Sequence, residues 1–263
     1  FSYRYYRNHY WDNFDLGSPR LLYTSLYEPK LKRYFTKILP QHPDTLKPQL
    51  DWLISQAKAN KETYRFVLGT IFNHYNRSKV MGMDEVFVHV ADYYLRGETD
   101  WNDSSYIADL RERVQKIKPN LLGKTAANFT LPTLENQYFS LHDVAADYTV
   151  LFFYEPDCGH CNKAAPVLQK ISEKFSPGQV QFVGFYTQVK PEEWKEFIDE
   201  KELHSWINVW DPYNKSNFRF FYNIYSTPTI YVLDKDKKIV AKRIGAGQTE
   251  EVLENLLDDG KLN

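Results

Sequence analysis

The chain has 263 residues, of which 43% are hydrophobic and 25% are charged, and its formal net charge is −1. This is the composition of a globular protein, long enough for one large or two ordinary domains. A charge so close to zero provides no overall field that would attract nucleic acid or a membrane surface. No apolar run approaches the roughly 18 residues of a membrane-spanning helix. Because the chain starts at Phe1 rather than Met, we expect that an upstream segment was removed, and such a segment could have held a secretion signal or a lipid anchor.

Residues 1–119 have the pattern of a helical domain. Apolar residues recur there at spacings of three and four, which is typical of amphipathic helices. The stretches with this spacing are 21–39, 43–59, 61–75, 86–95 and 106–117. Asp103 precedes the last of them and is suited to be its N-cap. We expect five or six helices packed as antiparallel hairpins, with no catalytic constellation among them.

From residue 120 to residue 263 the pattern changes to short strands that alternate with helices. We expect a small hairpin from two runs, 128–131 and 137–141, followed by further strands at 148–154, 180–186, 229–233 and 238–243. Helical patterns occupy 161–175, 191–201 and 249–257. Alternating strands and helices that end in a hairpin favour an α/β domain, with helices flanking a mixed sheet and the first hairpin as an N-terminal extension.

The only two cysteines of the chain, Cys158 and Cys161, lie in the stretch EPDCGHC. Three uses of such a pair are open. A structural disulfide between them would close a very small loop, and the stabilisation by a cross-link grows with loop size. A structural zinc site needs four ligands, and the chain has no second CxxC motif to complete one.

The third use is redox chemistry, and it employs every feature of the motif. Cys158 precedes a predicted helix, whose N-terminal N–H groups and dipole favour a thiolate that attacks a substrate disulfide. Cys161 lies one turn later and can attack the resulting mixed disulfide. Gly159 allows close approach of the backbone, and His160 adds a titratable group beside the thiolate. The helix terminus and His160 both stabilise the reduced form and so raise the reduction potential.

These residues resemble the thioredoxin superfamily, and the match extends beyond the CxxC motif. Pro166, five residues after Cys161, is placed like the proline that kinks the helix of that family. The segment STPT at 226–229, with Thr227 and Pro228, resembles the loop that carries the family's cis-proline and faces the active site. The resemblance covers about residues 120–260 and is strongest to the TlpA/ResA-like branch, members of which carry a helical domain ahead of the redox domain.

The resemblance implies a thiol:disulfide oxidoreductase outside the cytoplasm, periplasmic or exported. Its substrates would be protein thiols and disulfides, held by Thr227 and Pro228, and its electron donor a membrane-bound protein. No cofactor is implied other than the redox-active disulfide of Cys158 and Cys161. An anchor could lie in a segment outside this chain. Residues 1–119 would bind a partner or mediate self-association, or act as a spacer.

The sequence departs from the family pattern in two respects. The buried acid that many relatives carry is absent, since the strand before the motif reads Leu-Phe-Phe at 151–153 and position 164 is Ala. The dipeptide between the cysteines is Gly-His, as in disulfide isomerases, which points to a less reducing couple than thioredoxin. We expect Glu155 and Asp157 to form a solvated acidic rim.

Two other functions remain open. A thiol peroxidase on the same fold would call for Thr or Ser three residues before the nucleophilic cysteine, but position 155 is Glu. A non-enzymatic protein could instead use the thioredoxin-like domain as a scaffold for partner binding or metal handling. Trp194, Trp206 and Trp210 are expected to fill the core.

Overall fold

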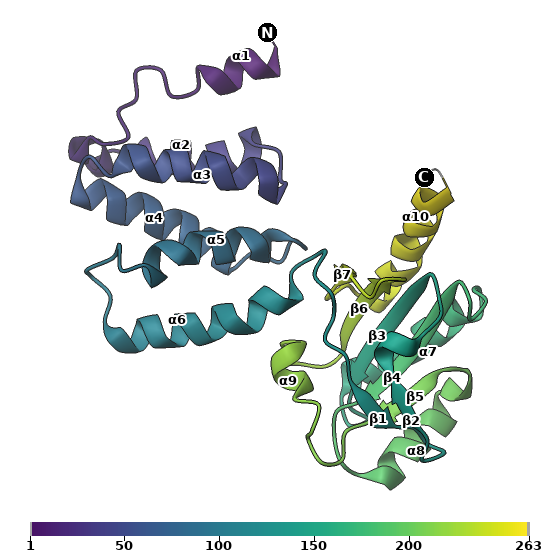
Figure 1. Cartoon of the computed structure of the whole chain (residues 1–263). Helices are drawn as coiled ribbons and strands as arrows, with labels where there is room; N and C mark the ends of the chain where they lie inside the picture. The colour runs from purple at the N-terminus through teal and green to yellow at the C-terminus, as the bar shows by residue number, and fades with distance from the viewer. Residues whose placement is uncertain (1, 262–263) are drawn as a thin grey trace. The chain divides into compact units, whose positions relative to one another are not determined.

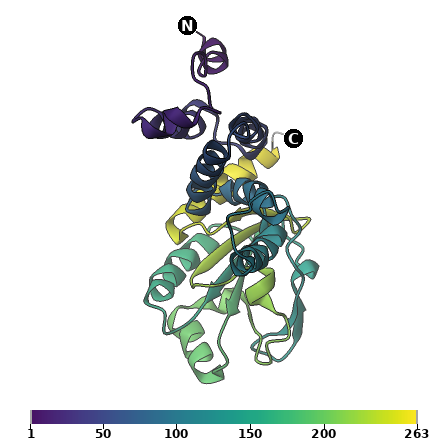
Figure 2. The same ribbon diagram turned by 90° about the vertical axis from the view of Figure 1, so that its left-hand side faces the viewer.

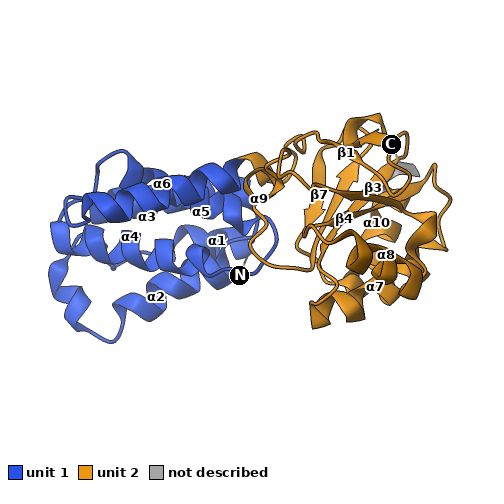
Figure 3. Ribbon diagram, turned by 90° about the horizontal axis from the view of Figure 1, so that it is seen from below, with its two compact units in different colours: residues 1–118 blue, residues 119–263 orange. Residues whose placement is uncertain are grey.

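The computed structural model describes the backbone of residues 2–261 and the side chains of residues 2–258. The chain divides into two compact units, residues 1–118 and residues 119–263 (Figure 3). Within the part of the chain that is described, no helix is both long enough and apolar enough to span a membrane.

The first unit consists of helices, and a long loop follows the first of them (Figure 1). The α-helices are α1 (Tyr3–Asn8), α2 (Tyr27–Arg33), α3 (Pro43–Ala57), α4 (Lys61–Asn76), α5 (Met83–Leu95) and α6 (Ser104–Ile117). Two shorter helical segments, η1 (Pro19–Tyr23) and η2 (Tyr34–Ile38), flank α2. Side-chain caps start α4 and α6: Asn60 accepts from the N–H groups of Glu62 and Thr63, and Asp103 from that of Tyr106.

The apolar faces predicted from the helical spacing form the core of this unit. Residues that are fully buried include Leu31, Phe35, Leu50, Leu53, Ile54, Val67, Leu68, Ile71, Val86 and Val90. The stretch with helical spacing at 21–39 is divided among three helical segments, η1, α2 and η2. Pro29 lacks an N–H group and is tolerated in the first turn of a helix, so α2 begins only at Tyr27.

The second unit contains a hairpin and a mixed five-stranded sheet. The hairpin pairs β1 (Thr130–Pro132) with β2 (Tyr138–Ser140). The sheet has the order β5-β4-β3-β6-β7. Its strands are β3 (Tyr148–Tyr154), β4 (Val180–Tyr186), β5 (Ile207–Trp210), β6 (Thr229–Asp234) and β7 (Ile239–Lys242). The strands β3, β4 and β5 are parallel, whereas β6 runs antiparallel to both β3 and β7.

Among the residues of this unit that the structure describes, four α-helices and several short 3-10 turns complete the fold. The helices are α7 (Gly159–Ser172), α8 (Pro191–Glu200), α9 (Phe218–Phe221) and α10 (Thr249–Lys261). The turns are η3 (Lys118–Asn120), η4 (Leu141–Asp143), η5 (Leu203–Ser205) and η6 (Ala246–Gln248). The predicted fold class, a helical domain followed by a thioredoxin-like α/β domain, is confirmed.

Alternate residues of the central strand β3 face two separate cores, as the two-residue period of a strand requires. Val150, Phe152 and Tyr154 pack with side chains of α7, α8 and α10. Leu151 and Phe153 pack on the other face with the hairpin and α9. Figure 2 shows the sheet between these layers. The edge strand β5 and helix α9 were not predicted, because each has four residues and too few positions for a periodic pattern.

Candidate active site

Cys158 lies where the central strand gives way to a helix. The strand β3 ends at Tyr154, a short turn follows, and Cys158 is the N-cap of α7 with extended backbone angles. The backbone N–H of Cys158 donates to the carbonyl of Glu155 at 3.1 Å, which closes the turn. The sulfur of Cys158 accepts from the backbone N–H of Cys161 at 3.4 Å. The cysteine therefore occupies the helix terminus predicted for it, where unpaired N–H groups favour a thiolate.

The two thiols differ in exposure and in acidity. Cys158 is half-buried, whereas Cys161 is 0% exposed, and neither forms a disulfide. Burial raises the pKa of Cys158, but hydrogen bonds from Cys161, the Thr227 side chain and the His160 backbone outweigh it, and the pKa lies below its ordinary value. Burial, with a smaller contribution from Cys158, raises the pKa of Cys161 to about 12, and hydrogen bonds from the Glu155 backbone and the Thr227 side chain offset only part of this effect.

The predicted proline loop lies directly beside Cys158. Residue Thr229 at the start of β6 pairs with Phe153 near the end of β3, and this register brings the preceding loop to the CxxC motif. The peptide bond between Thr227 and Pro228 is cis. The thiol of Cys158 donates to the backbone carbonyl of Thr227 at 3.4 Å.

The other residues singled out in the motif also lie at this end of the sheet. Gly159 begins α7, and the surroundings of its Cα are open, because no atom lies within 4 Å of where a Cβ would be. His160 is exposed in the first turn, and Pro166 lies inside α7. Asn162, which the sequence did not single out, donates from its side-chain amide to the carbonyls of Pro156 at 2.6 Å and Cys158 at 3.2 Å.

The structure corrects the expectation that Glu155 belongs to a solvated acidic rim. Its side chain is 26% exposed and is held by contacts from three segments. Its carboxylate accepts from the hydroxyls of Thr187 at 2.9 Å and Thr227 at 3.2 Å, and lies 3.9 Å from the guanidinium of Arg219 on α9. The parallel strands β3 and β4 end at the same edge, which is why Glu155 and Thr187 meet.

Asp157 does match the expected rim. It is exposed, and its carboxylate accepts from the side-chain amide of Gln188 at 3.0 Å. The three tryptophans named as core residues pack in the core that contains α7 and α8, as expected, with Trp194 and Trp206 buried and Trp210 partly buried.

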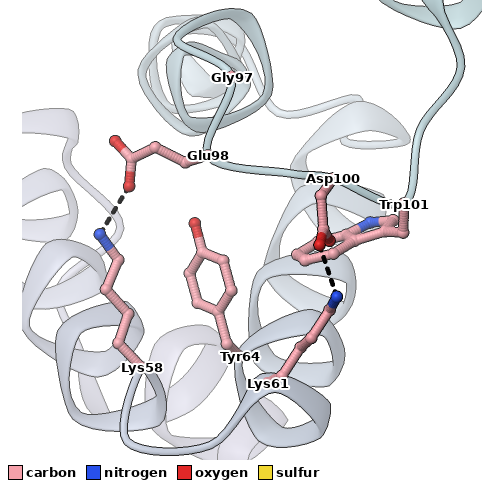
Figure 4. A pocket seen from close by; sticks show the side chains of 7 residues that line it. All are labelled: Lys58, Lys61, Tyr64, Gly97, Glu98, Asp100 and Trp101. Carbon is pink, nitrogen blue, oxygen red and sulfur yellow. Dashed lines mark hydrogen bonds and ion pairs between the residues drawn. The ribbon is translucent and has the colours of Figure 1, made fainter.

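Outside the cysteine site, the first unit has a shallow pocket of about 380 Å³ near the end of α5 (Figure 4). Lys58 pairs there with Glu98 at 2.6 Å, and Lys61 with Asp100 at 2.5 Å. Each lysine thus has its charge balanced within the pocket. Among the residues whose placement is described, no group of three or more His, Cys, Asp and Glu side chains is arranged to hold a metal ion.

Comparison with known proteins agrees with this division of the chain. Residues 122–242 match the model of the AhpC/TSA family, and residues 2–120 match a domain of unknown function, DUF5106. The thiol-disulfide oxidoreductase ResA of Bacillus cereus is 29% identical over 136 residues, which are 52% of this chain and 76% of that protein.

Two solved structures are similar as well. A domain of a possible thiol-disulfide isomerase from Cytophaga hutchinsonii is 39% identical, with a TM-score of 0.50, and the match covers 54% of this chain and 97% of that one. A thioredoxin-like protein from Bacteroides caccae matches 96% of this chain and 92% of its own, with a TM-score of 0.72 at 20% identity, a likeness of fold. Residues 122–242 therefore form an AhpC/TSA-family, thioredoxin-like domain related to the ResA thiol-disulfide oxidoreductases, and this domain follows a DUF5106 helical domain at residues 2–120.

Proposed function

We propose that this protein is a thiol:disulfide oxidoreductase that exchanges disulfides with protein substrates through Cys158 and Cys161, outside the cytoplasm. The observation that carries the proposal is the contrast between the two thiols. Cys158 is accessible and has a lowered pKa, whereas Cys161, one helical turn away, is fully buried and has a raised pKa. Such a pair separates an attacking thiol from a resolving thiol.

The first step is attack of the Cys158 thiolate on one sulfur of a substrate disulfide. A bond forms between Cys158 and that sulfur, the substrate disulfide breaks, and the other substrate sulfur leaves as a thiolate that takes up a proton. The lowered pKa of Cys158 increases the fraction of protein that can begin this step near neutral pH.

The second step releases the substrate. Cys161 loses its proton and attacks the sulfur of Cys158, and the second substrate sulfur leaves as a thiolate and is protonated. The substrate disulfide has then gained two electrons and two protons, and Cys158 and Cys161 form a disulfide. The same steps in reverse oxidise a substrate dithiol. No cofactor other than this cysteine pair takes part in the proposed reaction.

The loop at 226–228 is the proposed platform for the substrate. The carbonyl of Thr227 already accepts from the thiol of Cys158, so a chain bound along this loop reaches the nucleophile. Thr227 and Pro228 would position the substrate, Gly159 would leave room above the start of α7, and His160 would tune the couple through its position beside the sulfur.

Turnover as a reductase needs an external dithiol that returns two electrons to the Cys158–Cys161 disulfide. We assign that role to a membrane-bound electron donor, in keeping with the proposed exported, periplasmic location. Relatives named thiol-disulfide oxidoreductase ResA support the substrate class. The helical unit would select substrates by docking a partner or by self-association.

The test is reduction of insulin by the full chain with dithiothreitol as electron donor. Wild-type protein should accelerate the reaction, and Cys158→Ser should abolish the acceleration. The same protein should show no comparable turnover of hydrogen peroxide, which would distinguish disulfide exchange from peroxidase chemistry. A wild-type protein that leaves insulin reduction unchanged would contradict the proposal.

A further inference from the structure

Glu155 is connected to the reactive sulfur through one residue, Thr227. The side-chain hydroxyl of Thr227 donates to Oε2 of Glu155 at 3.2 Å, and its backbone carbonyl accepts from Cys158 at 3.4 Å. Oε1 of the same carboxylate is held separately, by Thr187 at 2.9 Å and by Arg219 at 3.9 Å. The carboxylate is thus fixed on one side and directed at Thr227 on the other.

A threonine hydroxyl has a single proton to donate. A donor to a carboxylate forms a charge-assisted hydrogen bond, which is stronger than a bond between neutral groups. The Thr227 side chain is also among the groups that lower the pKa of Cys158, whereas burial, the largest effect, raises it. While the Thr227 hydroxyl donates to Glu155, it has no second proton to donate to the Cys158 thiolate.

We propose that Glu155 is a positioning residue that holds the hydroxyl proton of Thr227 and so limits how strongly that hydroxyl stabilises the thiolate of Cys158. This inference deepens the proposed function, on which it rests, by assigning control of the nucleophile to a residue three positions before it. The charged and titratable groups nearest to Cys158 along the chain are Glu155 and Asp157 from the preceding turn and His160 and Cys161 from α7, and Arg219 from α9 lies beside Glu155.

The negative charge of Glu155 and its hold on the Thr227 proton would both raise the pKa of Cys158. The experiment must therefore separate these two effects. A negative charge near a thiolate raises its pKa whether or not Thr227 takes part. Only the proton-holding effect requires the Thr227 hydroxyl. A double-mutant cycle between Glu155 and Thr227 isolates the part that the two residues share.

The cycle uses the reduced full-length protein in four forms: wild type, Glu155→Gln, Thr227→Val and the double variant. The apparent pKa of Cys158 is read from the pH dependence of its alkylation by iodoacetamide, with the modified residue identified by mass spectrometry. Glu155→Gln should lower this pKa by about 0.5 to 1 unit. In the Thr227→Val background, the same substitution should produce less than half of that shift.

Asp157→Asn is the matched control. It removes a carboxylate next to Cys158, and the side chain it changes is bonded to Gln188 rather than to Thr227. Its effect on the pKa of Cys158 should therefore be the same with and without the Thr227 hydroxyl. Glu155→Asp is a second variant, which keeps the charge but withdraws the carboxylate from Thr227 by one methylene group. It should also lower the pKa, whereas a pure charge effect would leave the pKa unchanged.

The inference is overturned if Glu155→Gln shifts the pKa of Cys158 equally in both backgrounds, or if the pKa rises or stays constant. Should Glu155→Gln fail to fold by circular dichroism, the comparison of Glu155→Asp with and without Thr227→Val decides in the same way. Alkylation does not depend on turnover. A wild type that does not reduce insulin would therefore count against the proposed function and leave this measurement intact.

Discussion

The thiol of Cys158 and the carbonyl of Thr227 are 3.4 Å apart, although 69 positions separate the two residues in the chain. The contact joins the start of α7 to the loop before β6. It exists because β6 pairs in antiparallel fashion with β3, the strand from which the CxxC motif emerges. Several outcomes of substitution follow from this arrangement.

The difference in burial between the cysteines predicts which variant traps a substrate. In Cys161→Ser, the mixed disulfide formed by Cys158 has no internal thiol to resolve it and should accumulate. In Cys158→Ser, the remaining thiol is 0% exposed and should form little mixed disulfide. Non-reducing electrophoresis after incubation with oxidised substrate measures both. Equal trapping by the two variants would contradict the assignment of roles.

Replacement of His160 by Pro should make the couple more reducing. The backbone of His160 forms a hydrogen bond that lowers the pKa of Cys158, and proline has no N–H group to form it. A less stable thiolate favours the disulfide and so lowers the reduction potential of the cysteine pair, by about 10 to 30 mV. His160→Ala is the control, since it removes the imidazole and keeps the N–H. Redox titration against glutathione should place His160→Pro below both the wild type and His160→Ala. A potential that is unchanged or higher in His160→Pro would count against this explanation.

The second step of the reaction should accelerate as the pH rises. The pKa of Cys161 is about 12, so from pH 6 to pH 9 only a minor fraction is thiolate. That fraction, and with it the rate of substrate release, grows about tenfold per pH unit. Quenched-flow measurement of the mixed-disulfide lifetime gives the slope. The rate of Cys158 alkylation should level off at a lower pH than the rate of substrate release, because the pKa of Cys158 lies below its ordinary value. A lifetime that does not change with pH would mean that another group removes the proton from Cys161.

The long strands of the second unit could be predicted from sequence because their signal is local. The strands β3 and β4 have the bounds expected for them, 148–154 and 180–186. Both consist mostly of apolar residues, with an unbroken run at 150–154 in β3, and this pattern is typical of strands covered on two faces. The N-cap position of Cys158 was predictable for a similar reason, since a strand, a proline and a helical pattern follow one another within a few residues.

The role of Glu155 could not be predicted in this way. Its partners Thr187 and Thr227 lie 32 and 72 positions away, and nothing in the sequence around Glu155 indicates either. An acidic residue beside a proline and an aspartate has the pattern of an exposed turn. The short strand β5 was missed for a related reason, since its four residues are ordered by pairing with β4.

Gly184→Ala should destabilise the second unit. A Cβ at this position would lie 2.6 Å from Oδ1 of Asn208. That amide is fixed, because its nitrogen donates to the carbonyls of Leu203 at 2.8 Å and Trp206 at 3.3 Å. Overpacking of this kind costs about 1 to 3 kcal/mol. Gly178→Ala is the control, because a Cβ there meets no atom within 4 Å. Chemical denaturation followed by tryptophan fluorescence should separate the two variants, and equal stabilities would contradict the packing argument.

Residues 120–263 should fold on their own. They contain the whole five-stranded sheet and both of its cores. A fragment that begins at residue 120 also keeps the bonds that tie its first residues to the β6–β7 hairpin. The N–H of Gly123 donates to the carbonyl of Ile239, and that of Ala126 to the carbonyl of Lys237, each at 2.8 Å.

The isolated fragment should reduce a small generic disulfide as fast as the full chain, because every contact of Cys158 described above lies within it. It should differ from the full chain in its oligomeric state or in its rate with the native partner, if the helical unit docks that partner or mediates self-association. Light scattering and insulin reduction, carried out on both proteins side by side, measure the difference. A fragment that is unfolded by circular dichroism would make residues 1–119 part of the folding unit, and the docking role would have to be withdrawn. A fragment that folds and matches the full chain in every assay would instead favour a spacer.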